Sequence, residues 1–168
     1  LEFRRVLFRS QQTDLLPSIT AIYSLKTNMN LRATWSRTIA RPSFREMAAY
    51  RSYDPILEDL LDGNPNLKMS NIDNYDARWE WFPRPGELLS GSVFYKSLKN
   101  AIERKYLTTD GQIIGFDNRK EAKVYGVELE GRKNLDFLNP HLRPFSLGAN
   151  VSLIWSETAL TPAELNAR

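Results

Sequence analysis

Residues 70–96 read SNIDNYDARWEWFPRPGELLSGSVFYK, and this stretch decides the fold. In its first arm, every second residue is aromatic or apolar, and the residues between them are charged. Side chains of a strand alternate with a period of two, whereas a helix would scatter the two classes around its axis. Two prolines and a glycine within 83–86 break the pattern and predict a tight reversal. The apolar members of this arm are Tyr75, Ala77, Trp79 and Trp81, and the charged members are Asp76, Arg78 and Glu80.

The second arm repeats the alternation, so the stretch predicts a β-hairpin with one aromatic, apolar face and one polar face. In a soluble sandwich, the apolar face would pack on a second sheet. In an outer-membrane barrel, the apolar face meets lipid, the polar face lines a wet lumen, and Trp and Tyr gather near the headgroups. The three large aromatics of the first arm favour the barrel. In the second arm, Leu89, Gly91, Val93 and Tyr95 share the apolar face, and Ser90, Ser92 and Lys96 share the polar one.

Composition limits the other classes of protein. The 168 residues suffice for one ordinary domain. No apolar run approaches the roughly 20 residues of a membrane-spanning helix, but barrel strands expose only alternate residues to lipid. The absence of cysteine excludes disulfides and thiolate metal sites. The single histidine, His141, lies between prolines in a segment typical of a turn, so we expect neither a metal ligand nor a catalytic base there.

The positive charge of the chain is concentrated at its start. Residues 1–10 carry three arginines against one glutamate, a net charge of +2, which leaves +1 of the total +3 for the remainder. This segment resembles a translated cloning adapter and lacks the long apolar core and cleavage site of a signal peptide. We therefore expect residues 1–10 to be a non-native leader. Without it, the chain has no clustered basic footprint, so no nucleic-acid partner is predicted.

Residues 11–168 show six stretches with strand periodicity. Their connections alternate between short and long, with long loops at 41–69 and 99–118. This alternation is typical of outer-membrane barrels. The expected strands are also longer than the usual length of about five or six residues, and barrel strands need roughly 9 to 11 residues to cross a bilayer. The prediction is an all-β, antiparallel up-and-down meander of about six long strands, an open sheet that forms part of a large transmembrane β-barrel. The strands are expected near 16–25, 29–40, 70–82, 87–98, 119–133 and 144–156.

The long loops contain the candidate binding residues. Asp54 before Pro55 predicts the start of a short helix in the first loop, and an Asp-Gly pair predicts a small hairpin in the second. Tyr50, Arg51 and Tyr53 could contact a ligand, because loops on a rigid scaffold often carry binding residues. They could equally pack within their own loop, which is the more common outcome for aromatic loop residues.

No motif in the sequence predicts catalysis. Glu128 and Glu130 share a strand face, as the paired carboxylates of a glycosidase might, but a solvated lumen wall with Arg132 nearby explains them better. The acidic residues within 54–62 lack the spacing of a calcium-binding EF-hand loop. Phosphate-binding, zinc-protease, nucleophile-elbow and dinucleotide motifs are absent from the sequence. We therefore expect no enzyme, and no catalytic, cofactor-binding or metal-binding residues.

Several short motifs point to one family when their order is considered. GNPNLK at 63–68 precedes NYD at 74–76 and WEWF at 79–82. Other matching segments are ARPSF at 40–44, GELLS at 86–90, FYK at 94–96 and YGVELE at 125–130. Over about residues 16–157, this order and spacing resemble the barrel of TonB-dependent outer-membrane receptors.

The resemblance implies a barrel of about 22 strands, filled by an N-terminal plug, in the bacterial outer membrane. Such receptors import iron–siderophore complexes, cobalamin, oligosaccharides or similar nutrients, with energy from the TonB complex. With only about six strands and neither a plug nor a coupling box, this chain is expected to be a fragment. The expected partners are outer-membrane lipid, an imported small molecule, and TonB through the missing N-terminal region. The alternatives are a soluble carbohydrate-binding β-sandwich, whose second layer would cover the tryptophans, and a passive outer-membrane channel without a plug.

Overall fold

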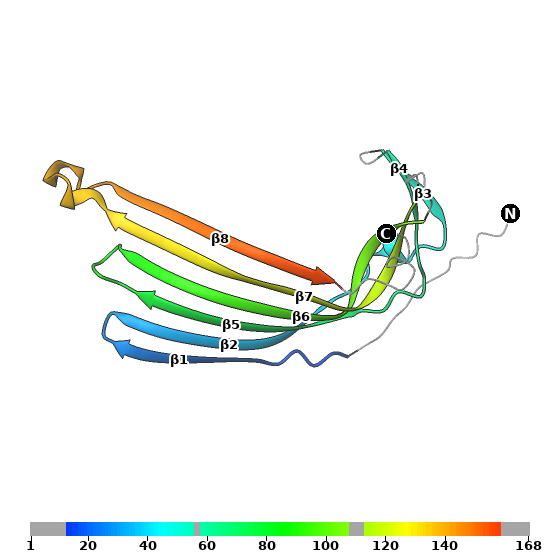
Figure 1. Ribbon diagram of the computed structural model, residues 1–168, viewed down its shortest axis with the longest axis horizontal. Helices are drawn as coiled ribbons and strands as arrows, with labels where there is room; N and C mark the ends of the chain where they lie inside the picture. The colour runs from blue at the N-terminus through cyan, green and yellow to red at the C-terminus, as the bar shows by residue number, and fades with distance from the viewer. Residues whose placement is uncertain (1–12, 56–57, 108–112, 159–168) are drawn as a thin grey trace.

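The computed structural model describes residues 13–55, 58–107 and 113–158, which form one curved sheet of eight strands (Figure 1). The order across the sheet is β1-β2-β5-β6-β7-β4-β3, and β8 also pairs with β7. None of the described helices is long or apolar enough to cross a membrane. The strands are β1 (Ser18–Lys26), β2 (Met29–Ala40), β3 (Arg51–Asp54), β4 (Asp59–Asp62), β5 (Ser70–Trp81), β6 (Leu88–Tyr106), β7 (Ile113–Asn134) and β8 (Ser146–Thr158), and the short helices are α1 (Phe44–Met47), η1 (Leu135–Phe137) and η2 (Pro140–Leu142).

The six long strands lie side by side in chain order, and each pairs antiparallel with the next. Short turns join β1 to β2, β5 to β6 and β7 to β8 at one end of the sheet, and the longer connections lie at the other (Figure 1). This confirms the predicted antiparallel meander and its alternating connections. We call these the turn end and the loop end.

The register places aromatic side chains in one row across five strands. Trp35 of β2 is opposite Tyr75 of β5, which is opposite Tyr95 of β6, and the row continues through Tyr125 of β7 to Trp155 of β8. The ring centroids of Tyr75 and Tyr95 are 6.2 Å apart, and those of Tyr125 and Trp155 are 5.9 Å apart. Trp and Tyr side chains gathered on one face in this way are typical of the lipid-facing side of an outer-membrane barrel.

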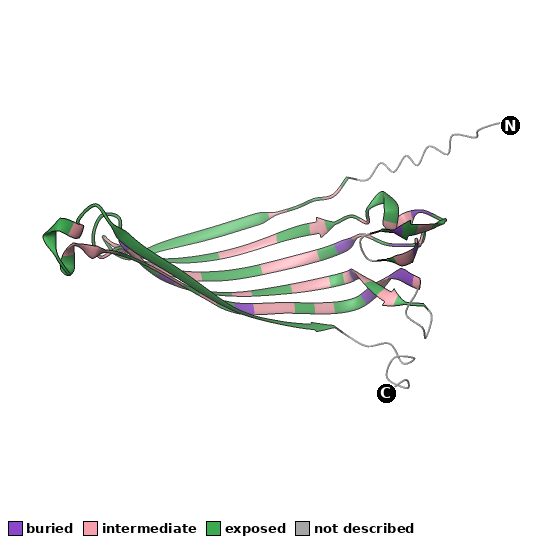
Figure 2. Cartoon of the chain, turned by 90° about the horizontal axis from the view of Figure 1, so that it is seen from above, coloured by how far each residue is buried: buried purple, intermediate pink, exposed green. Residues whose placement is uncertain are grey.

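The face that bears this row is exposed or half-buried across the long strands. Leu31, Val93, Leu129 and Val151 occupy it on β2, β6, β7 and β8, and each is between 43% and 59% exposed. Figure 2 shows a single curved layer, with no second sheet over either face in the described residues. A sandwich would bury this face against another layer, so the sandwich alternative is wrong for this part of the chain.

The exposed apolar residues run obliquely across the sheet. At β1 they extend toward the loop end as far as Leu15, before the strand begins. At β8 they extend toward the turn end, through Leu147 to Phe145, which is ten residues before Trp155. Barrel strands tilt by about 35–45° from the membrane normal, so a row of paired residues is not parallel to the membrane plane. A lipid band of constant height must therefore shift along successive strands, as these residues do.

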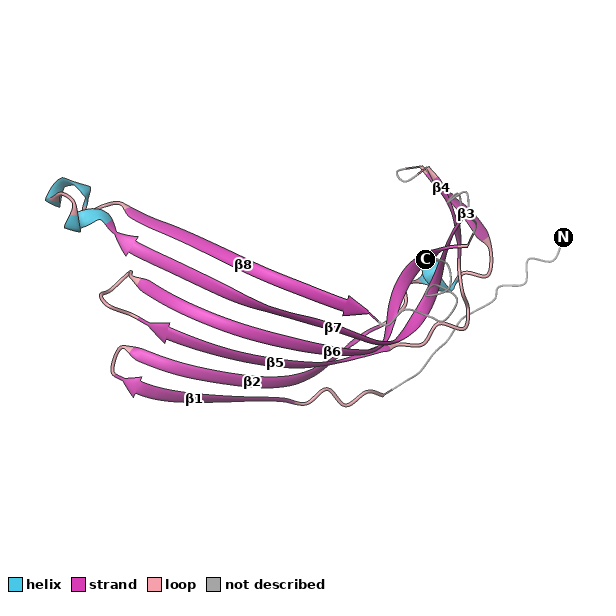
Figure 3. Cartoon of the chain, in the orientation of Figure 1, coloured by secondary structure: helices cyan, strands magenta, loops and turns pink. Residues whose placement is uncertain are grey.

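The first long connection, 41–69, differs from the prediction. The expected helix after Asp54 is wrong, because Asp54 ends β3, and 59–62 form β4 (Figure 3). The helix of this connection, α1, lies upstream and begins at a capping box. The Ser43 hydroxyl accepts a bond from the Glu46 amide at 3.3 Å, and the Glu46 carboxylate accepts one from the Ser43 amide at 2.6 Å. Ser-x-x-Glu is a sequence signal for a helix start, so α1 has a local signal that the position of Asp54 does not carry.

The second long connection, 99–118, is mostly strand. β6 continues to Tyr106 and β7 begins at Ile113, so the two strands extend their own pairing past the expected loop (Figure 3). The small hairpin predicted here is thus the outer part of the β6–β7 hairpin, and its expected Asp-Gly turn lies outside the described residues. Asn100 has a φ of 56° within β6, at the level where this extension starts.

Candidate functional site

The loop end of the sheet carries a small substructure that we call the outer cap. It consists of the connection 41–69, with α1, β3 and β4, and of the strand extensions within 99–118. Its centre is an apolar cluster in which each side chain is at most 7% exposed. Met47 of α1 and Ile102 of β6 pack against this cluster. The buried members are Leu61, Leu67, Ile114 and Phe116.

Two features bring the connection onto the strand extensions. β4 pairs with β7 in parallel, with Leu61 opposite Ile114. Just after β4, Gly63 passes against the backbone of Ala48, where a Cβ atom would overlap the Ala48 carbonyl. The Asn64 amide then donates to the Glu46 carbonyl at 2.7 Å. Only glycine allows so close a crossing of two backbone segments.

Asparagine side chains join the returning connection to the strands. The Asn64 side chain donates to the Phe116 carbonyl at 3.0 Å. The Asn118 side chain accepts from the Lys68 amide at 2.7 Å and donates to the carbonyls of Lys68 and Asn100 at 2.9 and 2.8 Å. These bonds give partners to backbone groups of the connection and of the strands beneath it, which is needed when a loop is packed rather than solvated. No local pattern predicts them, because their partners are 18 to 52 residues apart.

The predicted binding residues lie on the outer surface of the cap. Arg51 and Tyr53 share one face of the β3–β4 hairpin, and the alternate residue Asp54 is buried. Tyr50 and Tyr53 are each 59% exposed. Arg51 makes an ion pair with Asp62 at 3.0 Å, and its side chain stays half exposed. The structure therefore leaves the three side chains accessible, and their role in binding stays a prediction.

The cap folds over one particular face of the sheet. Its core residues Ile114 and Phe116 occupy even-numbered positions of β7, the same alternation as Glu128 and Glu130. The first connection therefore packs on the polar face and not on the aromatic face. In a closed barrel the polar face lines the lumen, so the cap narrows the lumen at its loop end.

The polar face below the cap carries ion pairs that cross several strands. The Arg78 guanidinium of β5 contacts Glu130 of β7 at 2.9 Å and Glu80 at 3.0 Å. Arg32 of β2 contacts Glu80 at 3.7 Å. The Ser92 hydroxyl donates to Glu128 at 3.5 Å. Glu128 and Glu130 are thus parts of a hydrogen-bonded wall, and no group of three potential metal ligands occurs among the described residues.

Two hollows of similar size have different surroundings. One, of about 540 Å³, lies between Trp35, Tyr75 and Tyr95 on the aromatic face. Because this face meets lipid in a barrel, the hollow suits acyl chains and not an imported ligand. The other, of about 550 Å³, lies at the cap, where Arg41 and Lys68 join Met47, Leu67 and Met69 in its lining. The cap hollow offers both positive charge and apolar surface.

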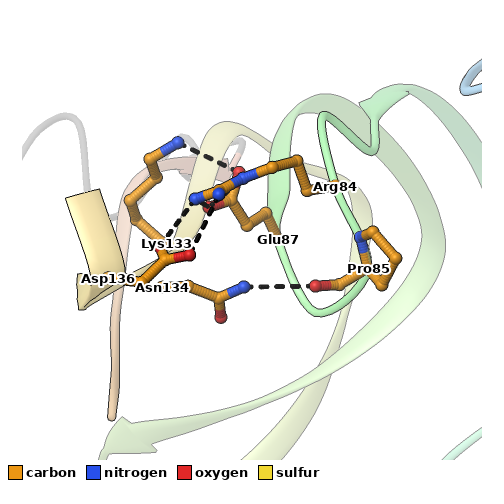
Figure 4. Close-up of polar contacts among 6 residues, drawn as sticks. All are labelled: Arg84, Pro85, Glu87, Lys133, Asn134 and Asp136. Atoms are coloured by element: carbon orange, nitrogen blue, oxygen red, sulfur yellow. Dashed lines mark hydrogen bonds and ion pairs between the residues drawn. The ribbon is translucent and has the colours of Figure 1, made fainter. Parts of the chain in front are cut away.

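The turn end is held by a group of charges that we call the clamp (Figure 4). The Glu87 side chain is fully buried and contacts Arg84 at 2.6 Å and Lys133 at 3.0 Å. Arg84 also contacts Asp136 at 2.8 Å, and the Asn134 side chain donates to the Pro85 carbonyl at 3.2 Å. Hydrogen bonding from Arg84, assisted by Lys133, lowers the pKa of Glu87 to about 2. The clamp thus joins the β5–β6 turn to the end of β7.

Known proteins match both the sequence and the fold. The family model described as TonB dependent receptor-like, beta-barrel matches residues 3–166. The siderophore receptor PirA from Pseudomonas aeruginosa has a TM-score of 0.63 at 21% identity, over 84% of this chain and 25% of that one. A mutant ferric enterobactin receptor, PfeA, from the same organism, in complex with enterobactin, has a TM-score of 0.55 at 22% identity, over 71% and 20%. No curated protein matches the sequence.

The family match covers nearly the whole chain, and it begins within the segment 1–10, whose expected non-native origin stays a prediction. The chain spans a quarter of the length of PirA, which agrees with a sheet too small to close a barrel. The aromatic row, the single layer and the alternating connections are those of an outer-membrane β-barrel. The chain therefore belongs to the TonB-dependent receptors of the outer membrane, as part of their β-barrel.

Proposed function

We propose that the chain is part of a receptor that imports an iron–siderophore complex across the outer membrane with energy from TonB. The observation that carries this proposal is the likeness of the sheet to siderophore receptors, over 84% of the chain for PirA. The geometry is consistent with it, because the aromatic face meets lipid, the polar face lines the lumen, and the cap lies where the lumen opens. In outer-membrane barrels the long loops face the outside of the cell, so the cap would meet the ligand first.

The chemistry of the cap suits such a cargo. Arg51 presents a half-exposed guanidinium that is paired with Asp62, while Tyr50 and Tyr53 supply exposed aromatic rings. Arginine binds oxygen-rich anions through a planar fork of donors, and aromatic rings stack on flat ligand groups. These features support a ferric complex with anionic oxygen ligands more directly than a neutral oligosaccharide.

The test is uptake by the full-length receptor in a strain without other ferric-siderophore receptors. Radiolabelled iron, supplied as ferric enterobactin and as other ferric siderophores, is expected to enter only when both the receptor and TonB are present. Uptake without TonB would instead indicate the passive channel. Uptake of cobalamin or an oligosaccharide, with no uptake of any ferric siderophore, would contradict the proposed substrate class.

A further inference from the structure

The connection from β7 to β8, residues 135–145, differs from the two other turns at the same end of the sheet. The β1–β2 turn is short, and the β5–β6 turn is occupied by the clamp. The β7–β8 connection instead contains η1 and η2, and it exposes three large apolar side chains. Phe137, Leu138 and Phe145 are 60%, 65% and 59% exposed. Exposed apolar groups gathered in one small region mark a surface that contacts a partner or a membrane.

This connection is an ordered structure. The Leu135 amide donates to the Phe145 carbonyl at 2.9 Å and closes its base. Within it, the Phe145 amide donates to the Leu142 carbonyl at 2.9 Å, and the Asn139 side chain accepts from the His141 amide at 3.0 Å. Asp136 ties it to the clamp through Arg84. The apolar side chains are therefore presented by a backbone that its own hydrogen bonds hold in place.

The apolar surface of the connection is continuous with the lipid-facing side of the sheet. Phe145 and Leu147 follow the same alternation as Val151 and Trp155, and all four are exposed. The oblique apolar band thus reaches the turn end on β8. Phe137 and Leu138 follow the last residue of β7 and are also exposed. A partner of this surface must also be a neighbour of the lipid-facing surface, which favours the membrane itself.

The cation beside this surface that has no acidic partner in the described part of the chain is Arg143. Lys133 contacts Glu87 and Arg84 contacts Asp136 within the clamp, and Arg132 lies on the polar face beside Glu130. Arg143 is exposed and has no ion pair among the described residues. Apolar side chains that enter the headgroup region, with cations beside them, are the features that bind protein segments to anionic membrane surfaces.

We propose that residues 135–145 form a foot that enters the headgroup region of the inner leaflet and binds an anionic phospholipid headgroup through Arg143. Short turns lie on the periplasmic side of outer-membrane barrels, so the lipid is a phospholipid of the leaflet that faces the periplasm. Phe137, Leu138 and Phe145 would be covered by acyl chains near the headgroups. The contact would fix the depth of the receptor on this side of the barrel.

Depth in the membrane can be measured with a spin label. Leu138→Cys and, as a control in the β1–β2 turn, Thr27→Cys are introduced into a full-length receptor without other cysteines, labelled, and placed in phospholipid vesicles. The label at 138 is expected to be several-fold more accessible to oxygen than to a water-soluble nickel complex, and the label at 27 to show the reverse. Equal nickel accessibility at both sites would overturn the proposal. The proposal would also be overturned if the label at 138 were shielded from the nickel complex only in intact cells, because a protein would then be the partner.

The lipid class is tested separately with Arg143→Gln. The receptor is extracted from vesicles that contain equal amounts of phosphatidylglycerol and phosphatidylcholine, and the lipids that remain bound are quantified. We expect the unmodified receptor to retain phosphatidylglycerol preferentially and the variant to lose most of that preference. Lys26→Gln, at the β1–β2 turn, serves as the charge-matched control. The same preference in Arg143→Gln and in the unmodified receptor would overturn the assignment of Arg143.

Discussion

The loop end of the sheet is held by buried apolar side chains, and the turn end is held by charges around one buried carboxylate. At the loop end, Phe116 and Leu61 are at most 4% exposed, and asparagines complete the backbone hydrogen bonds around them. At the turn end, Glu87 is equally buried, but its partners Arg84 and Lys133 are about half exposed. One end therefore depends on packing, and the other on the ionisation of a single side chain.

The difference follows from what each end must do. The cap is a long excursion of the chain, and loops of this length become ordered only if they bury apolar area of their own. The turn end joins strands that are already paired, so a few directed contacts suffice to fix its turns. We therefore expect the cap to respond to changes in packing volume, and the clamp to respond to pH and salt.

The largest effect is expected from Phe116→Ala in the cap. Truncation of a buried phenylalanine costs about 3–5 kcal/mol, and because this cluster is separate from the membrane band, the cap should unfold locally while the barrel stays inserted. Limited proteolysis of the full-length receptor should then cut within the cap. Phe44→Ala is the control, because Phe44 is in the same cap but is 71% exposed. Equal protease resistance of the two variants would show that the cap is not held by this core.

A substitution between the two ends tests the assignment of the faces. Val151→Arg puts a charge on the lipid-facing side and should hinder insertion by about 2–4 kcal/mol if it lies near mid-membrane. Asn150→Arg, one residue earlier on β8, puts the same charge on the lumen side and should be tolerated. Refolding yields into phospholipid vesicles measure both. Similar refolding yields for the two variants would contradict the assignment of Val151 to the lipid-facing side and Asn150 to the lumen side.

The clamp should show a particular dependence on pH. The pKa of Glu87 is lowered from 4.5 to about 2, so the folded state holds the carboxylate ionised where the unfolded chain would protonate it. Its stabilising contribution is complete above the unfolded value and disappears as the pH falls through about 2. Glu87→Gln should therefore lower the thermal stability at neutral pH, by less than Phe116→Ala, and should match the unmodified protein in strong acid. Glu121→Gln, an exposed glutamate, is the control; a pH-independent difference for Glu87→Gln would rule out the ionic explanation.

The smallest change in stability is expected at the surface of the cap. The Arg51–Asp62 ion pair is half exposed, and such pairs contribute less than about 1 kcal/mol. Arg51→Ala should thus leave the fold intact and, if the cap binds the ligand, reduce the affinity for a ferric siderophore several-fold in an equilibrium binding assay. Lys26→Ala, at the turn end, removes a charge far from the cap and should bind normally. Unchanged affinity in Arg51→Ala would exclude this residue from the binding site.

The paired long strands could be predicted from the sequence because their two faces meet different solvents. Alternation fixed β2 at residues 29–40 and β5 to within one residue of its expected end. The cap could not be found in this way. The four-residue strands β3 and β4 join the sheet through β7, where Leu61 of β4 is opposite Ile114, more than 50 positions further along the chain. The outer halves of β6 and β7 lack a regular alternation. Within the first connection, the local signal is that of α1, at Ser43 and Glu46.

The length of β7 has a further consequence. Its 22 residues are about twice the number that crosses a bilayer, so roughly half of the β6–β7 ribbon projects above the lipid. On a living cell, this half of the ribbon would lie outside the membrane, packed with the rest of the cap. An antibody raised against this part of the ribbon would bind intact cells, and its binding would report whether the receptor is on the surface.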